Sequence, residues 1–211
     1  MPARRTAPKL LPGLLIATAL AATAAPGSDN AVTLYGAWRS GGGFTDSGSQ
    51  QSLDLASSAA GAISLDFALD ASRQVQWYVS HQRTEVDLRA ATKPASAPDT
   101  LPLQLTYLHL GGTNFFEGQR GKGPYVVGGL GLTLFSPGLA GLSNEVRPSM
   151  NLGLGWQWPL GSSIALRAEA RGYLTLVNSH SGFFCSGGCV VSIQGDTLTQ
   201  GEVQLGLSFG F

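Results

Sequence analysis

Few side chains in this sequence could act as a catalytic base. The chain has three histidines, His81, His109 and His180. An ester hydrolase needs a histidine beside a serine or similar nucleophile, with a carboxylate to orient the ring. His81 and His109 share the parity of apolar residues, and His180 lies in the polar stretch NSHSG, where a histidine is usually solvated. The pattern favours a protein that is not an enzyme and uses no cofactor.

Two cysteines, Cys185 and Cys189, stand close together in CSGGC. In an oxidising compartment this spacing favours a local disulfide. A metal site would need further ligands, and His180 is the nearest candidate. We therefore expect a disulfide and no metal, with free thiols as the alternative.

Several segments alternate in polarity, and charged residues occur on their polar faces. If the polar faces of these segments enclose a narrow interior, an unpaired charge there would cost several kcal/mol, so the basic and acidic residues should pair. Such a network would either plug the interior or act as a gate for small solutes. The expected members are Arg39, Asp66, Arg167, Glu169, Arg171 and Glu202.

The composition excludes an ordinary soluble domain. The 211 residues include 13 basic and 13 acidic ones, so no nucleic acid or other polyanion is indicated as a partner. Charged residues make up 12% of the chain, about half of the roughly 25% usual in soluble domains. Gly is abundant, at 29 residues, and the chain after residue 25 has no continuous apolar span. Apolar surface is therefore spread over many short elements.

These elements are strands, because apolar residues recur at every second position and no stretch has helical periodicity. In the segment 163–177, Ile164 and Leu166 face one way while Arg167 and Glu169 face the other. The segment 52–70 places Leu53 and Leu55 on the face of Ile63, and the segment 101–116 changes parity, which suggests a bulge near His109. Strands are predicted over 32–44, 52–70, 73–89, 101–116, 124–136, 147–159, 163–177 and 199–211.

The connections favour a membrane barrel. The links after the second, fourth and sixth strands are short, whereas those after the third, fifth and seventh are long. Outer-membrane barrels alternate short periplasmic turns with long outer loops. The narrow interior of an eight-stranded barrel suits small and paired polar residues, so the apolar faces should point to lipid. The predicted fold is all-β, an eight-stranded antiparallel up-and-down transmembrane β-barrel.

The first residues have the features of an export signal. Arg4, Arg5 and Lys9 precede a short apolar run, and Ala22-Thr23-Ala24 matches a cleavage site. We therefore expect a signal peptide over 1–24, a short segment over 25–31 and the barrel domain over 32–211.

The chain closes on QLGLSFGF, an alternating strand that runs to its last residue. Its apolar face consists of Val203, Leu205, Leu207, Phe209 and Phe211. Several aromatic residues fall near the ends of strands on the side of the short turns, which predicts an interfacial girdle on the periplasmic side. Its expected members are Trp77, Trp156, Trp158, Phe209 and Phe211.

With these features the sequence resembles the small eight-stranded outer-membrane barrels, the superfamily that includes the transmembrane domain of outer-membrane protein A. The most specific mark is the terminal VQLGLSFGF, from Val203 to Phe211. The resemblance implies that this strand is the assembly signal read by the barrel assembly machinery. It also implies the outer membrane of a Gram-negative cell, with lipid and lipopolysaccharide as surroundings. The sequence departs from outer-membrane protein A in that we expect no wall-binding domain after the barrel, so tethering to the cell wall is not implied.

The last predicted loop combines the cysteines with an apolar cluster, Phe183, Phe184, Val190 and Val191. Exposed apolar clusters mark interaction sites, so this loop would bind an extracellular ligand, unless it packs over the barrel mouth. The expected role is structural or surface-interacting. The alternatives are a lipid A-modifying enzyme and a narrow solute pore. Ser179-His180-Ser181 lacks the His-x-Ser spacing of the lipid A deacylases.

Overall fold

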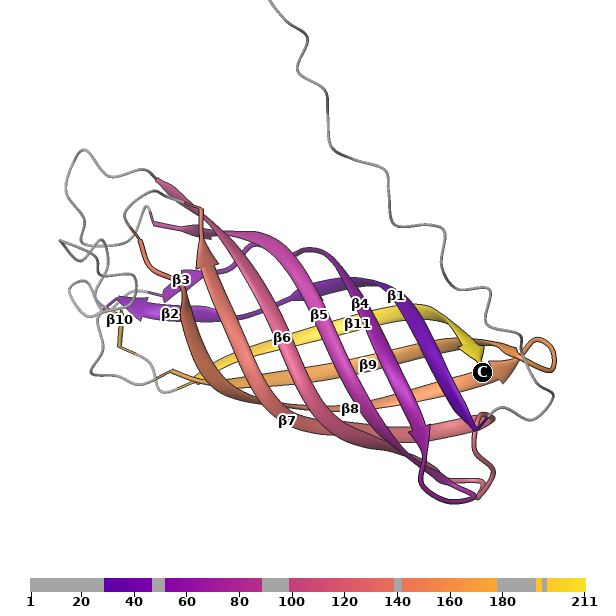
Figure 1. The fold of residues 1–211 in the computed structure, drawn as a ribbon. Helices are drawn as coiled ribbons and strands as arrows, with labels where there is room; N and C mark the ends of the chain where they lie inside the picture. Colours follow the sequence, from indigo (N-terminus) through magenta and orange to yellow (C-terminus); the bar gives the residue numbers. More distant parts are fainter. Residues whose placement is uncertain (1–28, 47–51, 89–98, 139–141, 178–192, 195–196) are drawn as a thin grey trace, which may run out of the picture.

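The structure, a computed structural model, is built from strands throughout the part of the chain that it describes (Figure 1). The predicted signal peptide, Cys185, Cys189, His180 and the apolar cluster of the last loop lie outside the described residues. No helix in the described ranges is long and apolar enough to cross a membrane. The structure describes residues 29–46, 52–88, 99–138, 142–177, 193–194 and 197–211.

Eight antiparallel strands close into a barrel, in the order β1-β11-β9-β8-β7-β6-β5-β4. The barrel closes because β1 pairs with β11 on one side and with β4 on the other. The predicted fold class is confirmed. The strands are β1 (Asn30–Ser40), β4 (Ser58–Ala68), β5 (Arg73–Asp87), β6 (Thr100–Phe115), β7 (Gly123–Pro137), β8 (Glu145–Pro159), β9 (Ile164–Leu176) and β11 (Thr197–Gly210).

Burial alternates along the strands, with apolar residues on the outer face and, through the middle of the barrel, mostly polar residues in the lumen. In β11, Leu205 is 61% exposed on the outer face, whereas its neighbour Gln204 is 3% exposed in the lumen. A soluble barrel has the opposite arrangement, since its apolar side chains fill the interior. The outward residues include Leu34, Leu65, Leu130, Leu152, Leu154 and Leu207, each at least 40% exposed.

The first two predicted strands are each divided. β1 ends at Ser40 because Gly41 and Gly42 adopt positive φ angles of 79° and 92°, which turn the chain out of the strand. The chain resumes as β2 (Gly43–Asp46) and β3 (Ser52–Asp54), which form a three-stranded sheet with β10 (Ile193–Gln194) at the loop end of the barrel. Figure 1 shows β2, β3 and β10 close together at this end of the barrel.

Two predictions of side-chain direction were wrong. Leu53 and Leu55 are buried, 1% and 6% exposed, whereas Ile63 points outward. Residues 56–57 lie outside any strand, so the alternation of β3 does not continue into β4. The bulge near His109 is also absent, because β6 pairs with β5 and β7 in unbroken register. His109 therefore faces the lumen.

The loop half of the lumen is apolar. Leu103 and Leu105 of β6 share the inner face of their strand with Tyr107, and Leu53 and Leu55 reach the same cluster from β3 and the bridge that follows it. We call this set the loop-end apolar cluster; it comprises Leu53, Leu55, Val86, Leu88, Leu101, Leu103, Leu105, Phe135, Val177 and Leu198.

Glycines allow β6 and β7 to bend closely against each other. A Cβ on Gly111 would overlap the backbone carbonyl of Gly128, and one on Gly131 would overlap that of Leu108. Because these obstacles are backbone atoms, a side chain could be accommodated only by moving the strands.

We predict that Gly111→Ala lowers the free energy of unfolding by about 1–3 kcal/mol, because the added methyl group forces β6 and β7 apart. Gly36→Ala is the matched control, since a Cβ there meets no atom within 4 Å; its effect should stay within about 0.5 kcal/mol. Urea unfolding of barrel refolded in detergent measures both. Equal effects of the two variants would contradict this account of the β6–β7 contact.

Candidate functional site

All six charged residues predicted for the interior are buried in the lumen. Each basic residue forms a salt bridge with one of the acidic residues: Arg167 with Asp66, Arg171 with Glu169 and Arg39 with Glu202. We call these residues the lumen network. Three positive charges are thereby balanced by three negative ones.

The Arg167–Asp66 pair lies toward the short turns. Arg167 Nη1 lies 2.8 Å from Asp66 Oδ2. The Asp66 carboxylate also accepts hydrogen bonds from Ser64 Oγ at 2.9 Å and Gln76 Nε2 at 2.7 Å. Arg167 donates further bonds to the side-chain carbonyl of Gln157 at 2.8 Å and of Gln74 at 3.2 Å. When hydrogen bonds occupy the remaining donor and acceptor positions of a buried ion pair, they offset most of the free-energy cost of desolvation.

Glu169 and Arg171 follow on the inner face of β9. Arg171 Nε donates to Glu169 Oε2 at 2.7 Å, and Gln204 Nε2 donates to the same oxygen at 2.7 Å. The other oxygen, Oε1, accepts from the hydroxyls of Tyr35 at 2.9 Å and Tyr125 at 2.6 Å. This carboxylate therefore joins four strands, β1, β7, β9 and β11.

Arg39 and Glu202 lie closest to the loop-end apolar cluster. Arg39 Nε donates to Glu202 Oε2 at 2.9 Å. The guanidinium lies over the rings of Tyr107 and Tyr173, 4.7 Å and 4.6 Å from their centroids. Cations over desolvated aromatic rings gain electrostatic energy. This pair connects the polar and apolar halves of the lumen.

Sequence reasoning missed the part that tyrosines take in the network. Tyr78 donates toward Glu202 at 3.1 Å and Tyr173 donates to the same oxygen at 2.6 Å. Tyr35 and Tyr125 fill the same role at Glu169. The signal was present, because these residues share the parity of the charged ones, but alternation does not say which partners meet across the lumen.

The expectation that His109 lies on the lipid-facing side of its strand is wrong, because its side chain points into the lumen. It is 1% exposed, and its Nε2 lies 2.9 Å from Ser149 Oγ in the lumen. Its Nδ1 has no hydrogen-bond partner within the described part of the chain. Within the described ranges, therefore, no carboxylate orients the His109 ring of the Ser149–His109 pair, as a triad requires. His81 does point outward, and its Nδ1 lies 2.9 Å from Thr106 Oγ1.

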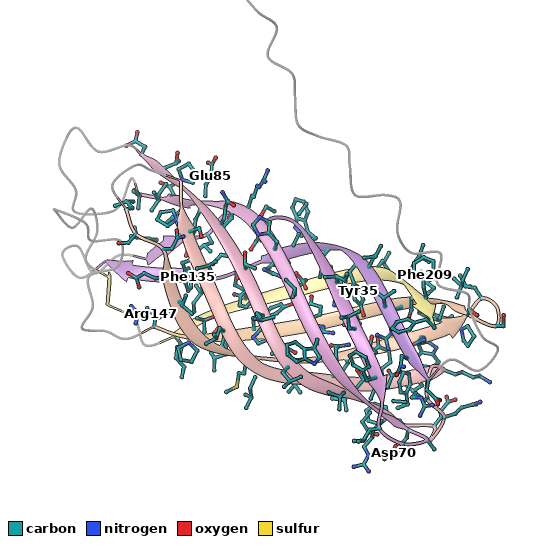
Figure 2. All side chains as sticks on the ribbon, in the orientation of Figure 1. Tyr35, Asp70, Glu85, Phe135, Arg147 and Phe209 are labelled. Carbon is teal, nitrogen blue, oxygen red and sulfur yellow. The ribbon has the colours of Figure 1, made fainter. Side chains whose placement is uncertain are left out.

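Two sets of predicted residues point outward from the barrel: the aromatic girdle and the apolar residues of the terminal strand. The girdle residues Trp77, Trp156, Trp158, Phe209 and Phe211 are between 38% and 51% exposed. They lie in the parts of their strands nearest the short turns or the C-terminus, and Figure 2 labels Phe209 there. Val203, Leu205 and Leu207 are exposed on the outer face of β11.

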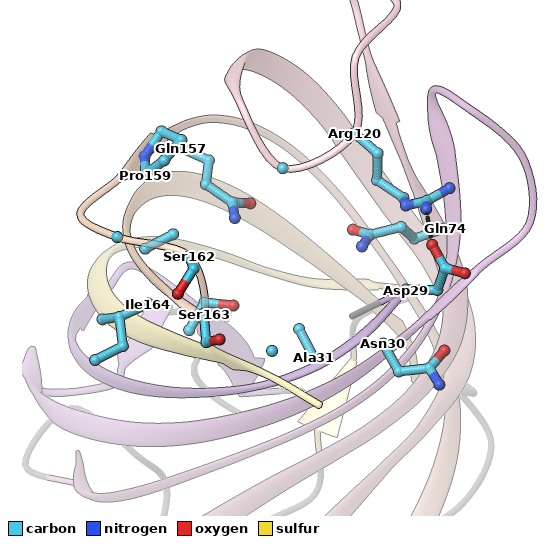
Figure 3. A pocket seen from close by; sticks show the side chains of 15 residues that line it. Asp29, Asn30, Ala31, Gln74, Arg120, Gln157, Pro159, Ser162, Ser163 and Ile164 are labelled. Carbon is cyan, nitrogen blue, oxygen red and sulfur yellow. Dashed lines mark hydrogen bonds and ion pairs between the residues drawn. The ribbon is translucent and has the colours of Figure 1, made fainter. Parts of the chain in front are cut away.

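The lumen opens at the turn end into a cavity of about 450 Å³, here called the turn-end vestibule (Figure 3). Gln74 and Gln157 reach it from β5 and β8, and Ser162 and Ser163 reach it from the turn between β8 and β9. Arg120, from the turn between β6 and β7, forms an ion pair with Asp29 at its rim.

We predict that Arg167→Met lowers the free energy of unfolding by about 3–5 kcal/mol, because it leaves the Asp66 carboxylate buried without its counter-ion. Adding Asp66→Asn removes that charge and should recover part of the loss. Urea unfolding in detergent provides the measurement.

The control is Arg73→Met, which removes an arginine from an exposed pair with Asp70; its effect should be small, since exposed ion pairs contribute little. A loss for Arg167→Met no larger than that of the control would contradict a stabilising network.

Comparison with known proteins finds similarity only at the level of structure. No family model and no curated protein sequence matches the chain. Neisserial surface protein A is similar to 87% of this chain and 98% of its own, with 18% identity and a TM-score of 0.56.

Two further solved structures are similar over most of their length. OprG from Pseudomonas aeruginosa matches 87% of this chain and 96% of its own, with 11% identity and a TM-score of 0.53. AlkL, solved in lipid bilayers, matches 99% of this chain and 96% of its own, with 13% identity and a TM-score of 0.50. The chain therefore has the fold of the small eight-stranded outer-membrane β-barrels.

Proposed function

We propose that this protein is an integral β-barrel of the outer membrane of a Gram-negative bacterium, with a structural or surface-interaction role. The observation that carries the proposal is the reversed burial of the barrel: its charges pair inside while its large apolar side chains are exposed outside. Such an outer surface is stable only against lipid. The shared fold of Neisserial surface protein A and OprG supports the same location.

In this arrangement the short turns face the periplasm. The exposed aromatic residues near the turns then form the girdle at the inner boundary of the membrane. The surroundings of the barrel are lipid and lipopolysaccharide, and the terminal strand β11 is the segment that the barrel assembly machinery reads.

The lumen is plugged in this proposal. The lumen network fills its middle with paired charges, and the loop-end apolar cluster fills the half beyond Arg39. A solute that crossed would have to separate buried ion pairs and then pass tightly buried leucines, of which Leu103 and Leu105 are 1% and 0% exposed. These two obstacles lie in series, which favours a plug over a narrow pore.

The protein has no catalytic activity in this proposal. Ser149 and His109 are the described residues that most resemble a nucleophile and its base, but Ser149 is 7% exposed and no described carboxylate contacts His109. The surface-interaction role falls to the loop end, where the β2–β3–β10 sheet extends beyond the barrel. An extracellular ligand would bind there, through the loop that carries Phe183 and Phe184.

We predict that the mature barrel produces no discrete conductance steps in planar bilayers. The double variant Arg39→Ala/Glu202→Ala should also stay closed, because the Arg167 and Arg171 pairs and the loop-end apolar cluster are retained. Heat-dependent migration in gels, performed on the same samples, verifies that the barrel is folded.

Discrete conductance steps from the wild-type barrel, with a larger conductance in the Arg39→Ala/Glu202→Ala variant, would instead establish that the protein is a narrow pore. The double variant is preferred to either single one because it leaves no buried charge without a counter-ion.

We predict that deleting Phe211 lowers insertion in cells far more than it lowers stability in detergent. Phe211 is 40% exposed, and its backbone nitrogen donates to the Asn30 carbonyl at 3.0 Å. Its loss should cost about 1–3 kcal/mol of unfolding free energy in either setting. Refolding in detergent bypasses the assembly machinery, so a lost recognition signal affects only the cellular yield.

The two measurements are the amount of folded barrel in outer membranes and urea unfolding of refolded protein. Leu160→Ala, which truncates an apolar side chain that is 63% exposed in a turn, is the control for loss of apolar surface alone. Normal insertion of the truncated chain would show that Phe211 is only the end of a strand.

A further inference from the structure

Arg167 determines which ends of two glutamines face the turn-end vestibule. Its Nε donates to Gln157 Oε1 and its Nη2 donates to Gln74 Oε1. An arginine side chain has donors and no acceptor, so it can bind only the carbonyl end of each amide. The two amide nitrogens are consequently the ends left for other partners.

These nitrogens have no protein acceptor among the described residues, although both side chains are only 7% exposed. Figure 3 shows Gln74 and Gln157 projecting from different walls into the vestibule. Each Nε2 carries two N–H groups, so the inner end of the cavity is rich in donors. Ser162 and Ser163 also line the cavity and add hydroxyl groups to it.

We propose that the turn-end vestibule binds the carboxylate group of a small molecule. Two primary amides that line one cavity offer their N–H groups to an acceptor with more than one oxygen, as a carboxylate has. The volume of about 450 Å³ leaves room for the rest of a small carboxylic acid.

The charges around the vestibule favour a carboxylate over a phosphate. Arg167 is neutralised by Asp66, and Arg120 is neutralised by Asp29. A dianion would therefore find no free counter-charge in these two arginines, whereas a single negative charge can be held by neutral donors. Under the proposed membrane orientation this site faces the periplasm, but its chemistry does not depend on the plugging of the lumen.

The experiment is a titration of the mature barrel, refolded in detergent micelles, with N-acetyl-alanyl-alanine and with its C-terminal amide. Side-chain amide signals in nitrogen-15 NMR spectra report binding at Gln74 and Gln157. The acid should bind at least about tenfold more tightly than the amide, since hydrogen bonds to a charged group are the stronger ones. Inorganic phosphate, titrated in parallel, should bind more weakly than the acid.

Gln157→Glu tests the site without removing the acceptor for Arg167. It replaces the vestibule-facing N–H groups by a carboxylate oxygen, and binding of the acid should weaken by about tenfold or more. Gln104→Glu makes the same chemical change at an exposed position outside the vestibule and should leave binding unchanged.

Equal affinity for acid and amide, tighter binding of phosphate, or full binding by Gln157→Glu would each overturn the proposal. If Gln157→Glu fails to fold, the wild-type spectra decide: the Gln74 and Gln157 amide signals must move with the acid and not with the amide.

Discussion

A closed interior too narrow for bulk water requires each polar group inside it to find its partner within the protein. The lumen network meets most of this requirement with three ion pairs whose further hydrogen-bonding positions are filled largely by glutamines and tyrosines. Arg39 Nη1 has no hydrogen-bond partner among the described residues, but its guanidinium lies over the rings of Tyr107 and Tyr173. Glu169 alone accepts bonds from three strands other than its own. Because these contacts cross the barrel, they fix the strands relative to one another more specifically than the backbone ladders can.

The outer face cannot provide that specificity. Lipid tails are as apolar as leucine, so an exposed side chain such as Leu152 gains little by preferring one neighbour to another. The barrel therefore differs from a soluble protein in where its sequence is constrained. Changes among apolar residues outside should be tolerated, whereas a change at Arg167 alters several hydrogen bonds at once.

Alternation, together with the alternating lengths of the connections and the narrow interior of an eight-stranded barrel, was enough to predict the fold and the members of the lumen network. Arg167, Glu169 and Arg171 share a parity opposite to that of Ile164 and Leu166, and a closed sheet turns that parity into inside and outside. Parity is a local property, however. It did not reveal that residues 56–57 interrupt the alternation and send Leu53 and Leu55 inward.

The contacts across the lumen were equally beyond the reach of a local pattern. Tyr35 and Glu169 are 134 positions apart in the chain, and their hydrogen bond depends on the curvature of the whole barrel. The inward position of His109 was missed for the opposite reason: the sequence offered a change of apolar parity near it, and the strand accommodates both sets of leucines without a bulge. The inner set packs in the loop-end apolar cluster and the outer set is exposed.

The pairing of β1 with β11 has a consequence for the order in which the chain can fold. β1 can pair with β11 only after the last strand has been made, because β11 is at the end of the chain. The hydrogen bond between Arg39 and Glu202 joins residues that are 163 positions apart. Closing so long a loop is entropically costly and comes late. As long as β11 has not joined the barrel, two strand edges stay open, one on β1 and one on β9. Each open edge is a template for association with another chain.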